Sequence, residues 1–223
     1  MPFLVRYLFN EIKDLLISQR VPVPIPNQAP PTADVRDLDF ELSNGLITGD
    51  KDAGIVLVNF TDYQCPYCSR YTRETYPQII KDYIDTGKIR YAVVDNPLAI
   101  HPLAPKAAEA ARCAKEQGKY WEMHETMLSD QQFLEKLSVY AEKTGLKARA
   151  FKTCIDSNKY TDAVKNDMEL AMQLKVTAVP GFVIAAAEGT NSLKFKGISS
   201  IQGAVPFDVF KRSLDQALEN VRK

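Results

Sequence analysis

Two of the four cysteines stand close enough in the sequence to form one reactive site. Cys65 and Cys68 enclose Pro66 and Tyr67, and an apolar run at residues 55–60, typical of a buried strand, precedes them. The residues after Cys65 have helical spacing, so this cysteine lies where the free N–H groups of a helix begin. Those donors and the helix dipole stabilise a thiolate, and we therefore expect a lowered pKa for Cys65.

The two-residue spacing predicts an asymmetric dithiol. One helical turn brings the second sulfur back to the first, which makes Cys65 the exposed nucleophile and Cys68 the buried resolving thiol. Cys68 would then attack a mixed disulfide formed on Cys65. Pro66 suits the first helical position because its φ angle is already set. This chemistry is thiol-disulfide exchange, and it needs no cofactor beyond a redox-active Cys65–Cys68 disulfide.

A metal site is the alternative from a different functional class. A CxxC motif is also half of a zinc site, but the sequence contains no second CxxC, no CxxH and no HxxxH. Four-cysteine zinc would require Cys113 and Cys154 to converge on the motif, so we predict no metal. A metal-binding or chaperone-like module that uses Cys65 and Cys68 would instead bind Zn²⁺ or Cu⁺ stoichiometrically and would not turn over dithiols.

The surrounding pattern predicts an α/β fold. Strand-like runs at 55–60 and 89–94 flank a helical segment at 66–86 that Pro77 should kink, which makes a βαβ unit. Helical stripes then follow one another over residues 102–175. Further expected elements are a short strand at 37–42, strands at 181–186 and 193–195, and a closing helix at 207–221. A helical domain is thus predicted to be inserted into the α/β unit.

The N-terminal region differs from the rest. Residues 1–20 have the spacing of an amphipathic helix, and residues 21–31 contain five prolines, typical of an extended linker. The helix has three possible roles: packing on its own domain, oligomerisation, and contact with a membrane surface. Arg6 and Asn10 interrupt its apolar run, which argues against a signal peptide.

Composition excludes two broad classes of function. The chain has 223 residues, with 28 Lys and Arg against 28 Asp and Glu, so its formal net charge is zero. A neutral chain offers no general field for nucleic acid. No apolar stretch approaches the ~18 residues that span a membrane.

Three segments resemble the thioredoxin superfamily, and most closely the DsbA-like thiol-disulfide oxidoreductases of the bacterial cell envelope. They are residues 58–68 (VNFTDYQCPYC), residues 101–121 with HPLA, AAEAARCA and QGKYW, and residues 176–180 (VTAVP). The resemblance covers about residues 40–220. It implies a thioredoxin fold divided into 37–100 with CPYC, an inserted helical domain at 101–175, and 176–223 with a cis-proline loop, preceded by the helix at 1–20 and the linker at 21–36.

The resemblance also implies functional residues. Pro180 would be the cis-proline that faces the active disulfide, and Pro66, Tyr67, Val179 and Pro180 would contact an extended substrate. Partners would be Cys-containing proteins and a membrane or soluble redox partner that resets the disulfide. The expected location is periplasmic or extracytoplasmic. An oxidase and an oligomeric isomerase or reductase assembled through the N-terminal helix both remain open.

Paired positions in several relatives imply that Cys113 and Cys154 form a structural disulfide, with two buried free thiols as the alternative. Two residues depart from the family. Asn59 stands where many members have a buried Glu, and Tyr67 stands where strongly oxidising members have His, which favours a weaker oxidant. We expect the side chain of Asp62 to point to solvent.

The two histidines are not expected to be catalytic. His101 precedes Pro102 at a predicted helix start, where it would cap the helix, and His124 would pack beside Trp121.

Overall fold

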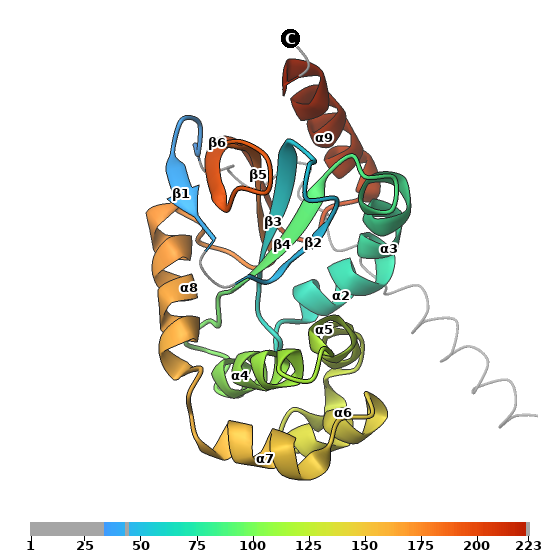
Figure 1. The fold of residues 1–223 in the computed structure, drawn as a ribbon, viewed down its shortest axis with the longest axis vertical. Coiled ribbons are helices and arrows are strands. Elements are labelled where there is room, and N and C mark those ends of the chain that lie inside the picture. The colour runs from blue at the N-terminus through green and yellow to red at the C-terminus, as the bar shows by residue number, and fades with distance from the viewer. Residues whose placement is uncertain (1–33, 43–44, 222–223) are drawn as a thin grey trace, which may run out of the picture.

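The computed structural model describes residues 34–42 and 45–221. The predicted helix at 1–20 and nearly all of the linker at 21–36 lie outside these residues. The fold is thioredoxin-like, as predicted, with a six-stranded mixed sheet and helices on both of its faces (Figure 1). Within the described part of the chain, no helix is long and apolar enough to cross a membrane.

The sheet has the order β1-β6-β5-β3-β4-β2. Its strands are β1 (Asp39–Glu41), β2 (Ile47–Gly49), β3 (Ile55–Thr61), β4 (Arg90–Asp95), β5 (Gly181–Ala187) and β6 (Lys194–Gln202). β3 pairs in parallel with β4 and antiparallel with β5. Every residue of the central strand β3 is buried, because both faces of the sheet are covered.

Alternate residues of β3 enter two separate cores. Ile55 and Leu57 lie in the core that contains α2 (Pro66–Glu74) and α9 (Phe207–Val221). Val56, Val58 and Phe60 lie in the opposite core, against α8 (Thr161–Gln173). The period of two along a strand accounts for this division.

Proline interrupts the helix that follows the CPYC motif. The predicted helix at 66–86 is divided into α2, α3 (Tyr76–Ile79) and the π-helical turn η1 (Ile80–Ile84). Pro77 has no N–H to donate and its ring clashes with the preceding turn, so α2 ends before it. The expected kink is confirmed: Thr75 between the two helices keeps a helical backbone, and its N–H still donates to the Tyr71 carbonyl oxygen at 2.9 Å.

The remaining helices, apart from α9, follow β4 and precede β5 along the chain. They are α4 (Ala104–Lys115), α5 (Tyr120–Ser129), η2 (Gln131–Phe133), α6 (Leu137–Lys143), α7 (Ala148–Asp156) and α8. Figure 1 shows α4, α6 and α7 together at the end of the molecule away from α9. The carboxyl end of β3 and the start of α2 lie between this helical group and the sheet.

Candidate active site

Cys65 occupies the N-cap position of α2, directly after the turn that leaves β3. Its backbone is extended, with φ −76° and ψ 122°, and Pro66 opens the helix. Both Cys65 and Cys68 carry free thiols in this structure. We expected Cys65 to be exposed, and this was wrong, because the residue is only 4% exposed. The outer surface of the motif is formed by Pro66 and by Tyr67, which is 57% exposed.

The two thiols differ sharply in acidity. The pKa of Cys65 is lowered to about 6, chiefly by the hydrogen bond from the Cys68 thiol and further by the backbone N–H groups of Cys68 and Tyr67, against the opposing effect of burial. Burial raises the pKa of Cys68 well above its usual value, and its hydrogen bond to Cys65 raises it further. Near neutral pH, Cys65 is therefore the thiolate and Cys68 keeps its proton.

The loop before β5 lies against the reactive sulfur. The peptide bond between Val179 and Pro180 is cis, and the Cys65 sulfur lies 3.6 Å from the carbonyl oxygen of Val179, to which it donates when it is protonated. Val179 and Pro180 are themselves buried. The structure thus brings together Cys65, Cys68, Val179 and Pro180, although 114 residues separate Cys65 from Val179.

Two buried polar side chains of β3 lie near the start of the motif in the sequence. Asn59 donates from Nδ2 to the Tyr91 hydroxyl at 2.8 Å, while its own Oδ1 is buried without a partner. The Thr61 hydroxyl is also buried and has no hydrogen bond of normal geometry. It nevertheless lies near enough to Cys68 to lower the pKa of that thiol, as the backbone N–H of Asp62 also does. Both effects oppose the larger increase that burial causes.

Three side chains that the sequence did not assign to the site hold the turn before Cys65. Gln131 donates from Nε2 to the carbonyl oxygens of Tyr63 (2.7 Å) and Cys65 (3.0 Å). Gln64 accepts from the Leu103 N–H at 2.9 Å. Asp62, expected to face solvent, is 1% exposed. An Asp two residues before a turn N–H is a recognisable signal, because its carboxylate can accept that N–H; Gln131 carries no such signal.

The histidines take different places. His101 was expected to cap the helix, but Leu103 is the N-cap residue of α4 and the ring of His101 lies on Asp62. The prediction that His124 is packed is confirmed: it is 1% exposed, and burial lowers its pKa to about 3. Its Nδ1 lies 2.8 Å from the Tyr63 hydroxyl.

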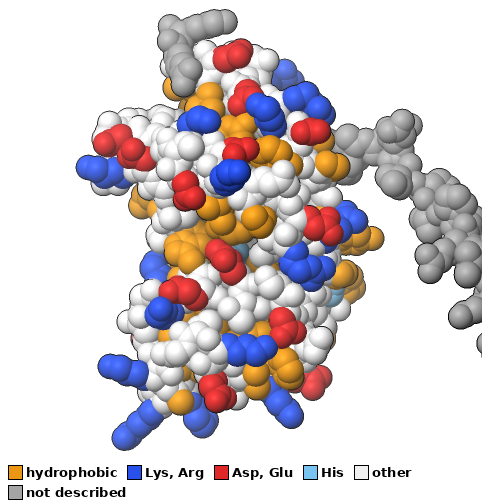
Figure 2. All heavy atoms as spheres, turned by 90° about the vertical axis from the view of Figure 1, so that its right-hand side faces the viewer, with side chains coloured by type: hydrophobic (Ala, Val, Ile, Leu, Met, Phe, Trp, Pro, Cys, Tyr) orange, Lys and Arg blue, Asp and Glu red, His pale blue; other side chains and the backbone are white. Residues whose placement is uncertain are grey.

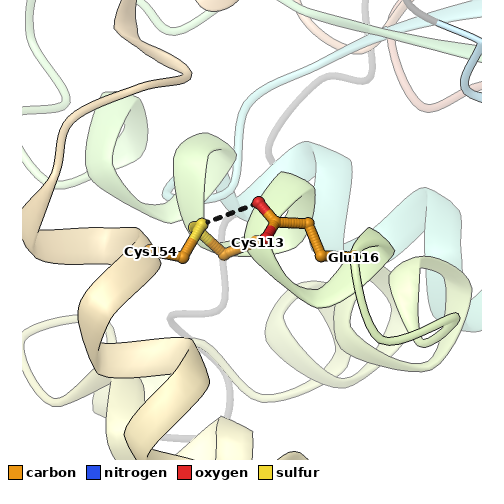
Figure 3. A group of neighbouring side chains, drawn as sticks. All are labelled: Cys113, Glu116 and Cys154. Atoms are coloured by element: carbon orange, nitrogen blue, oxygen red, sulfur yellow. Dashed lines mark hydrogen bonds between the residues drawn. A yellow bond between two sulfur atoms is a disulfide. The ribbon is translucent and has the colours of Figure 1, made fainter.

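The second cysteine pair lies in the helical insertion. Cys113 on α4 and Cys154 on α7 form a disulfide with a Cα–Cα distance of 5.8 Å. Figure 3 shows the carboxylate of Glu116 directed at the Cys154 sulfur, 3.1 Å away. Among the described residues, this trio is the group of Cys, His or acidic side chains whose geometry could hold a metal, but its sulfurs are bonded to each other. Cys65 and Cys68 do not belong to such a group.

Comparisons with known proteins agree with this geometry. The family model described as Thioredoxin matches residues 41–201. The structure of alpha-DsbA1 from Wolbachia pipientis superposes with a TM-score of 0.68 at 27% identity, over 80% of this chain and 93% of that chain. Disulfide bond formation protein D from Bacillus subtilis is 26% identical over 145 residues, which are 60% of this chain and 64% of that protein.

A longer relative also shares this region. A Na⁺/H⁺ antiporter from Salinispora tropica is 30% identical over 141 residues, which are 62% of this chain and 21% of the antiporter. The chain thus spans about a fifth of that relative's length. The family model, the fold and the placement of the CPYC motif against a cis-proline all agree. The chain belongs to the thioredoxin family, among its DsbA-like members.

Proposed function

We propose that the chain is a protein thiol-disulfide oxidoreductase that exchanges disulfides with Cys-containing proteins. The observation that supports this most directly is the contact between the Cys65 sulfur and the carbonyl oxygen of Val179, beside cis-Pro180. This contact leaves the loop next to the reactive sulfur, where an extended substrate segment can pair with the backbone of Val179 and lie against Pro66 and Tyr67.

The opposite pKa shifts of Cys65 and Cys68 assign the steps. In the oxidised chain, a substrate thiolate attacks the Cys65 sulfur, the Cys65–Cys68 bond breaks, and Cys68 leaves with the electron pair and takes a proton. A second substrate thiolate then attacks the substrate sulfur of the mixed disulfide and displaces Cys65. Cys65 is a good leaving group because the pKa of its thiol is about 6. The substrate loses two electrons, the chain gains them, and a separate redox partner must remove them.

The same dithiol can also run in reverse. The Cys65 thiolate attacks a substrate disulfide and Cys68 releases the product, which is reductase or isomerase chemistry. Tyr67 brings no positive charge to the thiolate, which favours a moderate oxidant. Figure 2 shows acidic and basic side chains intermixed on one face, with apolar patches between them, a surface suited to unfolded protein segments rather than to a strongly charged partner.

We place this activity in the periplasm or another extracytoplasmic compartment. The Cys113–Cys154 disulfide supports that location, because such bonds persist where the surroundings are oxidising. The names of relatives such as disulfide bond formation protein D also support it. The redox partner would be a membrane or soluble protein.

Trapping tests the proposal. With an unfolded protein that contains a disulfide, reduced Cys68→Ser should accumulate a mixed disulfide on Cys65, whereas Cys65→Ser should form none. Exchange that survives in Cys65→Ser would overturn the proposal. Stoichiometric Zn²⁺ binding through Cys65 and Cys68 without exchange would favour the metal-binding alternative instead.

Two further measurements separate the members of this class. Refolding of a scrambled-disulfide protein distinguishes an isomerase from an oxidase. Light scattering of the full chain and of a chain that starts at Ala33 tests assembly through the N-terminal helix, and a monomer in both would remove the oligomeric isomerase.

A further inference from the structure

Asp62 is a buried carboxylate three residues before Cys65. It is 1% exposed, and both of its oxygens have partners. Oδ1 accepts from the Gln64 N–H at 2.8 Å, while Oδ2 accepts from the Leu98 N–H at 2.8 Å and from His101 Nδ1 at 2.7 Å. Since a carboxylate only accepts, the proton of this last contact lies on the histidine. Three hydrogen bonds therefore fix the position of the carboxylate.

The backbone places Asp62 in the turn that ends at Cys65. The Cys65 N–H donates to the Asp62 carbonyl oxygen at 3.1 Å, which closes a tight turn between the end of β3 and the start of α2. Negative charge on Asp62 disfavours negative charge on Cys65, so the carboxylate raises the pKa of the Cys65 thiol against the groups that lower it. A buried charge acts through a lower effective dielectric than an exposed one, which strengthens this effect.

His101 is the basic side chain that contacts Asp62, because the nearby arginine has other partners. Asp95 forms an ion pair with Arg112 at 2.8 Å. Burial raises the pKa of Asp95, and the negative charge of Asp62 raises it further. That arginine also binds Asp167, so its charge is already shared between two carboxylates. His101, with 15% of its side chain exposed, lies between Asp62 and solvent.

We propose that Asp62 and His101 are a positioning pair that moderates the acidity of Cys65 and thereby tunes the reduction potential of the Cys65–Cys68 disulfide. The carboxylate limits how far the thiolate is stabilised, and His101 holds the carboxylate in place through its Nδ1 contact. The same carboxylate ties the active-site turn to the loop at 96–103, which carries Ile100 with 78% of its surface exposed. The effect on potential rests on the proposed function, but the effect on acidity does not.

The alternative is that Asp62 only anchors the loop, and the sign of the change in pKa separates the two. Asp62→Asn keeps the size of the side chain and removes its charge. If the charge restrains Cys65, the pKa of Cys65 should fall by about half a unit, an approximately threefold gain in thiolate at pH values below that pKa. If the side chain is only an anchor, loosening the turn should move Cys65 away from the helix N–H groups and leave its pKa unchanged or higher.

His101→Asn is the matched control. The Asn Nδ2 can occupy the place of the His Nδ1 and donate to Asp62, so the anchor remains while the imidazole ring is lost. The pKa of Cys65 should then stay the same or rise. Thiol pKa values would come from alkylation rates of the reduced full chain from about pH 4 to about pH 9, with Cys65 identified by peptide mass spectrometry.

Reduction potentials against glutathione complete the test. Asp62→Asn should have a more oxidising potential than the parent chain, in step with its lower pKa. An unchanged or higher pKa in Asp62→Asn, or a fall in both variants, overturns the inference. A fall in Asp62→Asn alone, in a protein that exchanges no disulfides, would leave the inference standing and overturn the proposed function.

Discussion

At the scale of single residues, the reactive motif depends on opposite pKa shifts in two identical side chains, Cys65 and Cys68. The start of α2 supplies N–H groups to Cys65, and the packing beneath α2 removes water from Cys68. Ordered exchange requires this difference: Cys65 must be a stable thiolate that attacks and leaves, and Cys68 must stay protonated until it attacks the mixed disulfide. The difference also affects the folding stability of the reduced chain.

Reduction should make stability depend on pH through Cys65. Its pKa in the folded chain, about 6, lies below the ~8.5 of an unfolded cysteine, so its contribution is full above the unfolded value and is lost as pH falls through about 6. Urea unfolding at about pH 5 and about pH 8 should show the reduced chain gaining stability relative to the oxidised chain as pH rises. Every group other than Cys65 and Cys68 titrates in both forms, and folded Cys68 keeps its proton over this range because burial raises its pKa well above its usual value. A flat difference between the two forms would therefore contradict this prediction.

Thr61 should speed the step in which Cys68 attacks. Its unpaired hydroxyl lies at the end of β3 and opposes the increase that burial causes in the Cys68 pKa. Thr61→Val keeps the shape and removes the donor, so release of a mixed disulfide from Cys65 should slow by about fivefold. Thr61→Ser, which keeps the hydroxyl, is the control. Single-turnover decay of a glutathione mixed disulfide measures the step, and equal rates in Thr61→Val and the parent chain would exclude this role.

At the scale of elements, the sequence predicted the helices and strands whose formation depends on interactions between residues close together in the chain. The apolar run of β3 and the CPYC turn were readable because strand burial and helix capping act within a few residues. β2 was missed, and β6 was predicted as only three residues, because Lys194, Lys196 and the serines of β6 carry little strand signal. Pairing with β5 and β1 across long sequence separations makes these segments strands. The role of Gln131 in holding the turn before Cys65 was not predicted for the same reason, because the two carbonyl oxygens to which it donates lie far away in the sequence.

A buried ion network joins the inserted helices to the sheet. Arg112 on α4 donates to Asp95 on β4 and to Asp167 on α8. Arg112→Leu leaves two carboxylates without their buried partner and should cost about 3 kcal/mol or more in the free energy of unfolding. Arg149→Leu, the same change at an exposed site on α7, should stay within about 0.5 kcal/mol. Urea unfolding would compare them, and equal losses would show that the network adds nothing to stability.

At the scale of the whole molecule, the reactive CPYC motif and the structural Cys113–Cys154 disulfide lie in different parts of the fold. The exchanging thiols lie where α2 leaves the sheet, and the bonded pair lies inside the helical insertion, between α4 and α7. Both pairs contain buried sulfur, so burial alone does not distinguish them. The sequence marked the reactive pair by its position at a helix start, whereas the pairing of Cys113 with Cys154 followed only from resemblance. Stability and reactivity should therefore be separable by mutation.

The double variant Cys113→Ala/Cys154→Ala tests this separation. Its disulfide joins residues 41 apart, and closing a loop of that length stabilises by about 4 kcal/mol on the chain-entropy model. The oxidised variant should lose about that much in urea unfolding, while the pKa of Cys65 should remain near 6, because the groups that lower it belong to α2. Alkylation of Cys65 at several pH values measures the second quantity. A shifted Cys65 pKa in a folded variant would show that the insertion also controls the thiolate, and the two halves of the molecule would then have to be treated as one electrostatic unit.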